Sequence, residues 1–171
     1  KSLCKMKKVQ FLIITIVLIS STSYCQSTLP IKDGKVTYTN VINVDSVRKD
    51  ELFVRAKKWF ATTYKSANDV IQMDDKDAGE IVGKGNMQIK YYARNPRIRH
   101  TITISVKDGK YRYIISDLEY SDIQGDKFNI ENFPKAWFGE QKLYDVIDSN
   151  VKAIIESIKA AMTSSKKNDD W

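Results

Sequence analysis

Cysteine and histidine are almost absent from this sequence of 171 residues. Its two cysteines, Cys4 and Cys25, both lie among the first 25 residues, and its single histidine is His100. Residues 26–171 therefore provide no disulfide framework, no thiol nucleophile and no cysteine-ligated metal site. A domain built from them must be held together by packing alone, and we expect it to bind no metal or other cofactor.

Long apolar runs are also missing, with one exception close to the beginning of the sequence. There, a basic segment with four lysines precedes the apolar run Phe11–Ile19, and the small polar residues Ser20–Ser23 follow it. This order is typical of a signal peptide, and the run has only about half the length of a membrane-spanning helix. We predict that residues 1–25 are a signal peptide, with Met6 as the initiator, and that the protein is periplasmic or secreted.

The fate of Cys25 decides whether the exported protein is anchored. The tripeptide that ends at Cys25, directly before Gln26, fits signal-peptide cleavage after a small residue. The alternative is a lipoprotein, in which Cys25 is retained and acylated and attaches the protein to the membrane. A lipoprotein signal has a small residue before its cysteine, whereas this sequence has Tyr24. We therefore favour simple cleavage.

The positive charge of the sequence lies largely in this leader. The whole chain has 28 basic and 21 acidic residues and a net charge of +7, but residues 1–25 contribute four lysines and no acidic residue. Without them the chain has 24 basic and 21 acidic residues and a net charge of +3. Because nucleic-acid-binding domains carry a strongly basic surface, we expect no nucleic-acid partner.

Hydrophobic patterning predicts one α+β domain over residues 35–162, with the element order β-α-β-β-β-β-α. Apolar residues alternate in a strand over 35–44, and they recur at helical spacing within 47–64, after Ser46 as the helix N-cap. Four further strands and a second long helix follow, over residues 69–74, 80–92, 97–107, 110–119 and 141–162. We expect residues 163–171 to be a polar tail.

The Asp108-Gly109 turn predicts how the last two strands pair. A two-residue loop of this composition is a strong hairpin signal. It places Val106 opposite Tyr111 and, further along, His100 opposite Asp117. The apolar residues of both strands then share one face.

A second turn predicts the pairing of the preceding strands. If residues 93–96 form a four-residue loop, Tyr91 lies opposite Ile98, and the apolar residues again share that face. Because the two turns agree, we expect a curved antiparallel sheet with two helices packed on one of its faces.

Several short motifs distinguish residues 35–122, namely Lys49–Leu52, Trp59-Phe60, Ser66–Gln72, Gly79–Gly85 and Tyr111–Tyr113 with Asp117. Together they resemble DUF4468, a family of domains of unknown function. The resemblance implies a TBP-like fold and an exported protein, since most members are exported proteins of Bacteroidota. It leaves the helix at 141–162 outside the shared core, and it implies no reaction, substrate or catalytic residue.

His100 and Asp117 are the one predicted pair with a catalytic arrangement. A carboxylate can fix the tautomer of an imidazole and raise its basicity. However, no cysteine is available as a nucleophile, and the nearby Ser105 and Ser116 lie within strands rather than in a nucleophile turn. The pair therefore fits either a hydrolase-type enzyme or a structural hydrogen bond at the end of the sheet, and we favour the hydrogen bond.

Basic residues gather at one hairpin end and can bind an anionic partner, namely Lys90, Arg94, Arg97 and Arg99. The alternative is a solvated surface that protects the edge of the sheet. Two other patterns carry less chemistry. The acidic turn at 74–77 lacks the ligand spacing of an EF-hand, and Gly83 and Gly85 share one strand face, which indicates close packing of a helix on the sheet or a bend.

Aromatic residues are concentrated in one loop, at Phe128, Phe133, Trp137 and Phe138. Such residues either fill the gap between the sheet and the second helix or rim a groove for an apolar ligand or peptide. In the second case, Phe133, Trp137 and Phe138 are the candidate ligand-binding residues.

These observations favour a non-catalytic, exported module that binds a ligand or partner in the cell envelope. The partner would be an envelope protein or a small apolar ligand, and a membrane would be involved only if Cys25 is lipidated. The alternatives are a hydrolase that uses His100 and Asp117, and a structural subunit of an envelope assembly.

Overall fold

The computed structural model describes residues 29–134 and 139–164. The predicted signal peptide, residues 165–171 of the predicted polar tail, and Trp137 and Phe138 of the aromatic loop lie outside the described residues, whereas Thr163 is still part of the last helix. Within the described ranges, no helix has both the length and the apolar character needed to cross a membrane.

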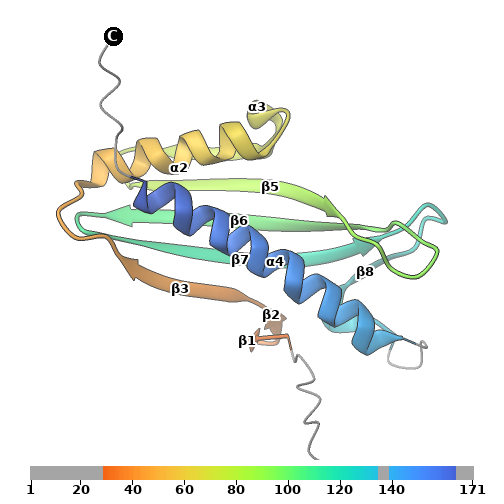
Figure 1. Ribbon diagram of the computed structural model, residues 1–171. Coiled ribbons are helices and arrows are strands. Elements are labelled where there is room, and N and C mark those ends of the chain that lie inside the picture. The colour runs from red at the N-terminus through yellow and green to blue at the C-terminus, as the bar shows by residue number, and fades with distance from the viewer. Residues whose placement is uncertain (1–28, 135–138, 165–171) are drawn as a thin grey trace, which may run out of the picture.

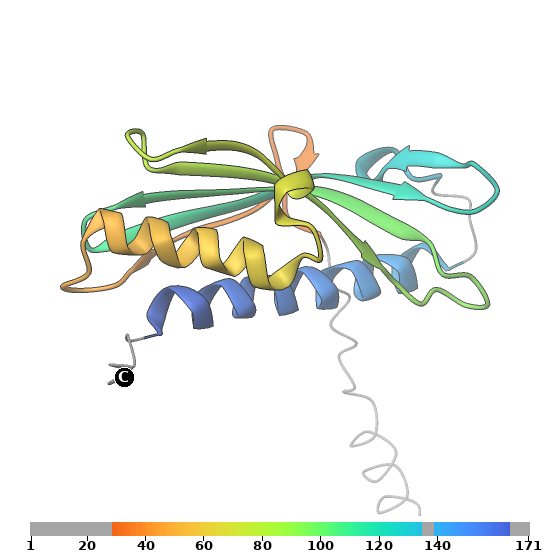
Figure 2. The same ribbon diagram turned by 90° about the horizontal axis from the view of Figure 1, so that it is seen from above.

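The helices and strands follow the predicted order, with several short elements added. In chain order they are β1 (Ile31–Lys32), β2 (Lys35–Val36), β3 (Tyr38–Asn43), α2 (Lys49–Thr63), α3 (Ala67–Val70), β4 (Ile71–Asp75), β5 (Glu80–Gln88), β6 (Arg97–Lys107), β7 (Lys110–Ser121), β8 (Lys127–Asn129), η1 (Ile130–Asn132) and α4 (Glu140–Thr163). The main sheet is antiparallel with the strand order β3-β7-β6-β5-β4, and β8 pairs with β7. Both long helices lie on the same face of this sheet (Figures 1 and 2), which confirms the predicted α+β arrangement.

The core lies between the helices and the face of the sheet that they cover, here called the inner face. Side chains alternate between the two faces of a strand, and in β6 the inner residues Ile98, Ile102 and Ile104 are all buried. Helix α4 contributes a buried stripe at helical spacing, with Leu143, Ile147, Asp148, Val151, Ile155, Ile158 and Met162. Each long strand and helix is therefore amphipathic, because it buries only one of its faces.

Polar contacts fix the two helices to each other and to the sheet. The Trp59 indole N–H of α2 donates to the Ser157 hydroxyl of α4 at 3.0 Å. The Tyr38 hydroxyl of β3 donates to the buried carboxylate of Asp148 on α4, also at 3.0 Å, and Lys152 pairs with the same carboxylate at 2.7 Å. A buried carboxylate is tolerated when it is paired in this way.

The sequence predicts Ser46 as the N-cap of helix α2, but in the structure a distant residue has this role. Ser46 lies in a turn with φ of 64°, and the helix starts at Lys49. The backbone N–H of Lys49 donates to the Asp108 carboxylate at 2.7 Å. The β6–β7 turn therefore supplies the oxygen that an N-cap side chain normally provides.

The β5–β6 hairpin is tighter than predicted. Met87, rather than Tyr91, lies opposite Ile98, and the chain reverses between Tyr91 and Arg94, which exchange two backbone hydrogen bonds of 3.0 Å. The predicted pairing was therefore wrong by four residues. Because strand side chains alternate with a period of two, a shift by an even number keeps each residue on its predicted face.

Gly83 and Gly85 allow helix α2 and the residue after it to approach β5 closely, as their shared strand face indicated. A Cβ atom on Gly83 would lie 2.4 Å from Cε1 of the buried Phe60, and one on Gly85 would lie 2.5 Å from the hydroxyl of Tyr64. Both distances are shorter than any normal contact. The glycines therefore set how close the helix layer lies to the sheet.

We predict that Gly83→Ala lowers the free energy of unfolding by about 1–3 kcal/mol, because the added methyl group overpacks the core against Phe60. Urea denaturation measures this change. Adding Phe60→Leu to Gly83→Ala should cost less than the sum of the two single changes, since the smaller side chain makes room for the methyl group. Simple additivity of the two effects would contradict the proposed contact.

Candidate functional site

The predicted pairing of His100 with Asp117 is wrong because β7 contains a bulge. The β6–β7 register follows the prediction as far as Thr101, which lies opposite Ser116. Beyond that pair the register shifts, and Asp117 has φ of 53°. The extra residue of a bulge is left unpaired and re-aims its side chain, so Asp117 does not face His100.

The bulge also changes which alternate residues of β7 are buried. Tyr113 and Ile115 are buried before it, whereas Leu118 and Tyr120 are buried after it. This change from odd to even positions is present in the sequence. It is the signal that could have located the bulge.

His100 lies in the core, on the face of the sheet that the helices cover, and contacts Tyr64 at the end of α2. Its side chain is 2% exposed, and its Nε2 atom lies 3.0 Å from the Tyr64 hydroxyl. Burial lowers the pKa of His100, because the charged imidazolium would lose its hydration, and this effect outweighs a backbone hydrogen bond with Ile98 that would raise the pKa. The histidine therefore has a structural hydrogen bond, with Tyr64 instead of Asp117.

Asp117 lies at the surface and pairs with Lys35, at 3.2 Å. Burial alone would raise the pKa of Asp117, but hydrogen bonds from Lys35, Thr101 and Ser116 outweigh it and the pKa is lowered. His100 and Asp117 both border an open depression of about 420 Å³ beside the bulge. The imidazole is nevertheless hydrogen-bonded to Tyr64, so His100 and Asp117 do not form a catalytic pair.

The basic residues predicted to bind an anionic partner are all exposed, namely Lys90, Arg94, Arg97 and Arg99. Two of them have acidic partners. Arg94 lies 3.3 Å from Asp122, and Arg99 lies 3.4 Å from Glu119. These pairs offset part of the positive charge, which weakens this hairpin end as an anion-binding surface.

The described part of the aromatic loop contributes to the core. Phe133 is 2% exposed, and its ring packs edge-on against Tyr120 at 5.6 Å and against Phe128 at 5.9 Å between centroids. Such pairs stabilise a core beyond their burial alone. Phe133 is therefore a core residue that packs against Tyr120 and Phe128, and it does not rim an open groove.

The acidic turn shows ordinary surface contacts. Asp74 pairs with Lys57, and the Asp75 carboxylate accepts a hydrogen bond from the Ala78 N–H at 2.8 Å. Across residues 29–134 and 139–164, no group of three or more potential metal ligands lies together.

The face of the sheet opposite the helices, here called the outer face, has no helix over it in the described structure (Figure 2). Strand register aligns one row of neighbours across five strands, here called the apolar row, which consists of Thr39, Ile114, Thr103, Val82 and Met73. Met73 is 40% exposed, and Val41 beside the row is 54% exposed. The outer face thus carries exposed apolar side chains at Val41 and Met73 and half-buried ones at Ile114 and Val82.

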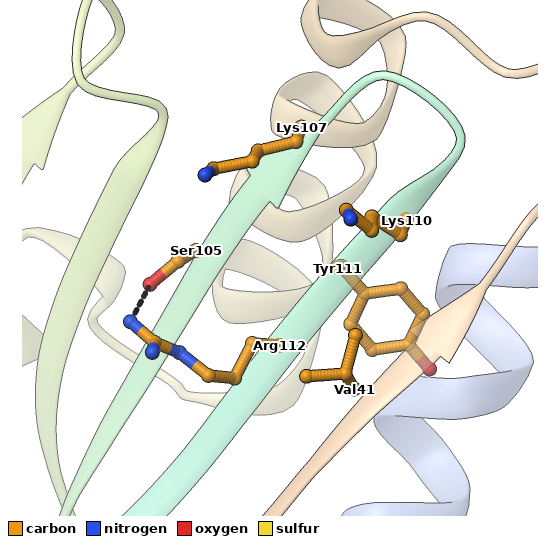
Figure 3. A pocket seen from close by; sticks show the side chains of 6 residues that line it. All are labelled: Val41, Ser105, Lys107, Lys110, Tyr111 and Arg112. Atoms are coloured by element: carbon orange, nitrogen blue, oxygen red, sulfur yellow. Dashed lines mark hydrogen bonds between the residues drawn. The ribbon is translucent and has the colours of Figure 1, made fainter.

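The next rows of the outer face are charged and end in a group of cations. Arg112 lies between Val41 and Ser105, and Lys107 lies directly opposite Lys110. These residues surround a cavity of about 240 Å³ (Figure 3). We call Lys107, Lys110 and Arg112 the cationic cluster.

The cationic cluster has no acidic partner of its own among the described residues. The Arg112 guanidinium donates a long hydrogen bond to the Ser105 hydroxyl, at 3.5 Å. Sequence reasoning missed this cluster, although the register predicted from the Asp108-Gly109 turn already placed Lys107 opposite Lys110. This pairing of two lysines across a hairpin was the signal that could have revealed the cluster, because opposed like charges are unfavourable without a counter-charge.

Comparison with known proteins gives a family match and a shared fold. Residues 38–121 match a family described as a domain of unknown function (DUF4468) with TBP-like fold. The chain is similar to the crystal structure of a TBP-like protein from Parabacteroides distasonis, with 17% identity and a TM-score of 0.72 over 81% of this chain and 99% of that one. It is also similar to a DUF4468 family protein from Bacteroides ovatus, with 18% identity and a TM-score of 0.68 over 82% and 93% of the two chains. No curated protein matches the chain.

We predict that the folded protein becomes less stable as the pH falls below about 6.5, the usual pKa of histidine. The unfolded chain then binds a proton that the buried His100 resists, so the free energy of unfolding falls by up to about 1.4 kcal/mol per pH unit. Urea denaturation at several pH values measures this slope, and His100→Gln should remove that part of it.

Because His100 is the only histidine, its ring protons can also be followed by NMR in the unmodified chain. The native resonance should titrate below pH 6.5 or not at all before unfolding. A titration midpoint above that value, or an equal pH slope in His100→Gln, would contradict the structural role.

Proposed function

Because residues 38–121 are a DUF4468 domain with a TBP-like fold, a match that carries no assigned reaction, we propose that the chain is an exported, non-catalytic binding module. Its outer sheet face binds a partner in the cell envelope. The alternative of a hydrolase depended on His100 and Asp117, and the bulge separates those two side chains.

The observation that carries this proposal is the ordered apolar row on a face that no described helix covers. Ile114 and Val82 are half-buried in the middle of the row, and Met73 is exposed at its edge. The inner face already supplies the core, so these residues are not needed to hold the helices. Apolar side chains that reach the surface and are rimmed by charges are typical of interaction surfaces.

Support for export comes from the leader, whose basic, apolar and small-polar segments follow the order of a signal peptide. Export also fits residues 26–171, which have no cysteine and therefore need no redox partner to fold in an oxidising compartment.

Mass spectrometry of the protein purified from cells that express the full sequence should find Gln26 as the first residue, with no acyl group. A mature chain that begins at an acylated Cys25 would instead support the lipoprotein alternative. Recovery of the whole leader on the protein from intact cells would contradict export.

Photo-crosslinking tests the outer face as the binding surface. We expect a photoreactive amino acid at Thr103, in the middle of the apolar row, to give a discrete crosslinked product in living cells. The same amino acid at Ala153, which is exposed on α4, is the matched control and should give none, since α4 covers the inner face.

Loss of the Thr103 product on adding Met73→Glu would tie the contact to the apolar row, because a buried unpaired charge is costly at an interface. Equal products from Thr103 and Ala153, or none from either, would overturn the outer face as the binding surface.

A further inference from the structure

The cationic cluster lies beyond the apolar row, at the end of the outer face formed by the β6–β7 turn (Figure 3). Lys107 and Lys110 occupy directly opposed positions on the two strands, and Arg112 is the next outward-facing residue of β7. All three side chains are exposed. Three positive charges on adjacent positions of one sheet face repel one another unless an anion lies between them.

The nearest acidic side chains are already engaged elsewhere. The Asp108 carboxylate accepts a hydrogen bond from the backbone N–H of Lys49 at the start of α2. Glu80, on the neighbouring strand, accepts a hydrogen bond from the Ser105 hydroxyl at 2.9 Å. Asp75 lies opposite Glu80 on β4, one strand further from the cluster. Two carboxylates, Asp108 and Glu80, thus lie near three cations, and a positive charge remains.

From this arrangement we infer that the cationic cluster binds a phosphate group of the partner or ligand. The inference rests on the proposed function, because it uses the same outer face, and it adds the chemical class of the bound group. Val41 borders the cavity on the β3 side. An apolar part of the same ligand would therefore lie toward the apolar row.

The composition of the cluster favours phosphate over a single carboxylate. A phosphate group carries up to two negative charges and three terminal oxygens, which suit three separate cations. Arginine binds phosphate through two parallel hydrogen bonds, and lysine contributes a point charge that adapts to its position. Asn43 lies opposite Lys110 on β3, so an amide donor also adjoins the cluster.

An NMR titration of the protein expressed from its full sequence tests this inference, with inorganic phosphate as the probe and chloride at equal ionic strength as the reference. Phosphate should shift the backbone amides of residues 107–112. Lys110→Gln/Arg112→Gln should weaken binding about tenfold or more, since each change removes a charged hydrogen bond. Lys84→Gln/Arg97→Gln removes the same charge from the same face and should weaken binding less than about twofold.

Vesicles of phosphatidylcholine, with and without phosphatidic acid, separate the two sources of the phosphate group, because the headgroup of phosphatidic acid is a phosphate monoester. Binding to the phosphatidic acid vesicles that the Lys110/Arg112 variant loses identifies a lipid headgroup. A response to inorganic phosphate alone identifies a soluble phosphorylated ligand.

Two results would overturn the inference, namely amide shifts that chloride reproduces and equal weakening by both double variants. If the Thr103 crosslink persists in the Lys110/Arg112 variant while no phosphate binds, only this inference fails. If phosphate binds but no crosslink forms at Thr103, the proposed function fails instead.

Discussion

Burial of a single face of the sheet is the constraint on which the rest of this structure depends. Helices α2 and α4 cover the inner face, and the long strands β6 and β7 bury apolar residues there at alternate positions. Gly83 and Gly85 let Phe60 and Tyr64 approach the sheet closely, so the glycines and the aromatic residues are matched to one another. Because this packing completes the core, the outer face is not needed to hold the helices and is available for binding.

The bulge at Asp117 shows how the same constraint shapes the chemistry. It lets Leu118 and Tyr120 stay in the core after the alternation has changed, and it moves Asp117 to the surface beside Lys35. A regular strand would have brought that carboxylate toward His100. The burial of apolar side chains therefore prevents His100 and Asp117 from pairing, and the buried imidazole is hydrogen-bonded to Tyr64 instead.

Charge is distributed unevenly over the outer face. At the end near the β5–β6 turn, Arg94 and Arg99 have acidic partners, whereas at the opposite end the cationic cluster has none among the described residues. The apolar row runs between these ends. A surface with this order suits a partner with an apolar part and an anionic group, and it depends on strand register because register decides which side chains are neighbours.

The sequence by itself determined the two long helices, the strands β3 to β7, the Asp108-Gly109 turn and the inner face of these strands as far as the bulge in β7. These features follow from local periodicity and turn composition, which act over a few residues. Only the tertiary structure decided that Met87 lies opposite Ile98, that Asp108 caps α2 and that His100 forms a hydrogen bond with Tyr64. A period of two specifies the face of a strand residue but not its partner, and a cap from a distant turn exists only after the chain has folded.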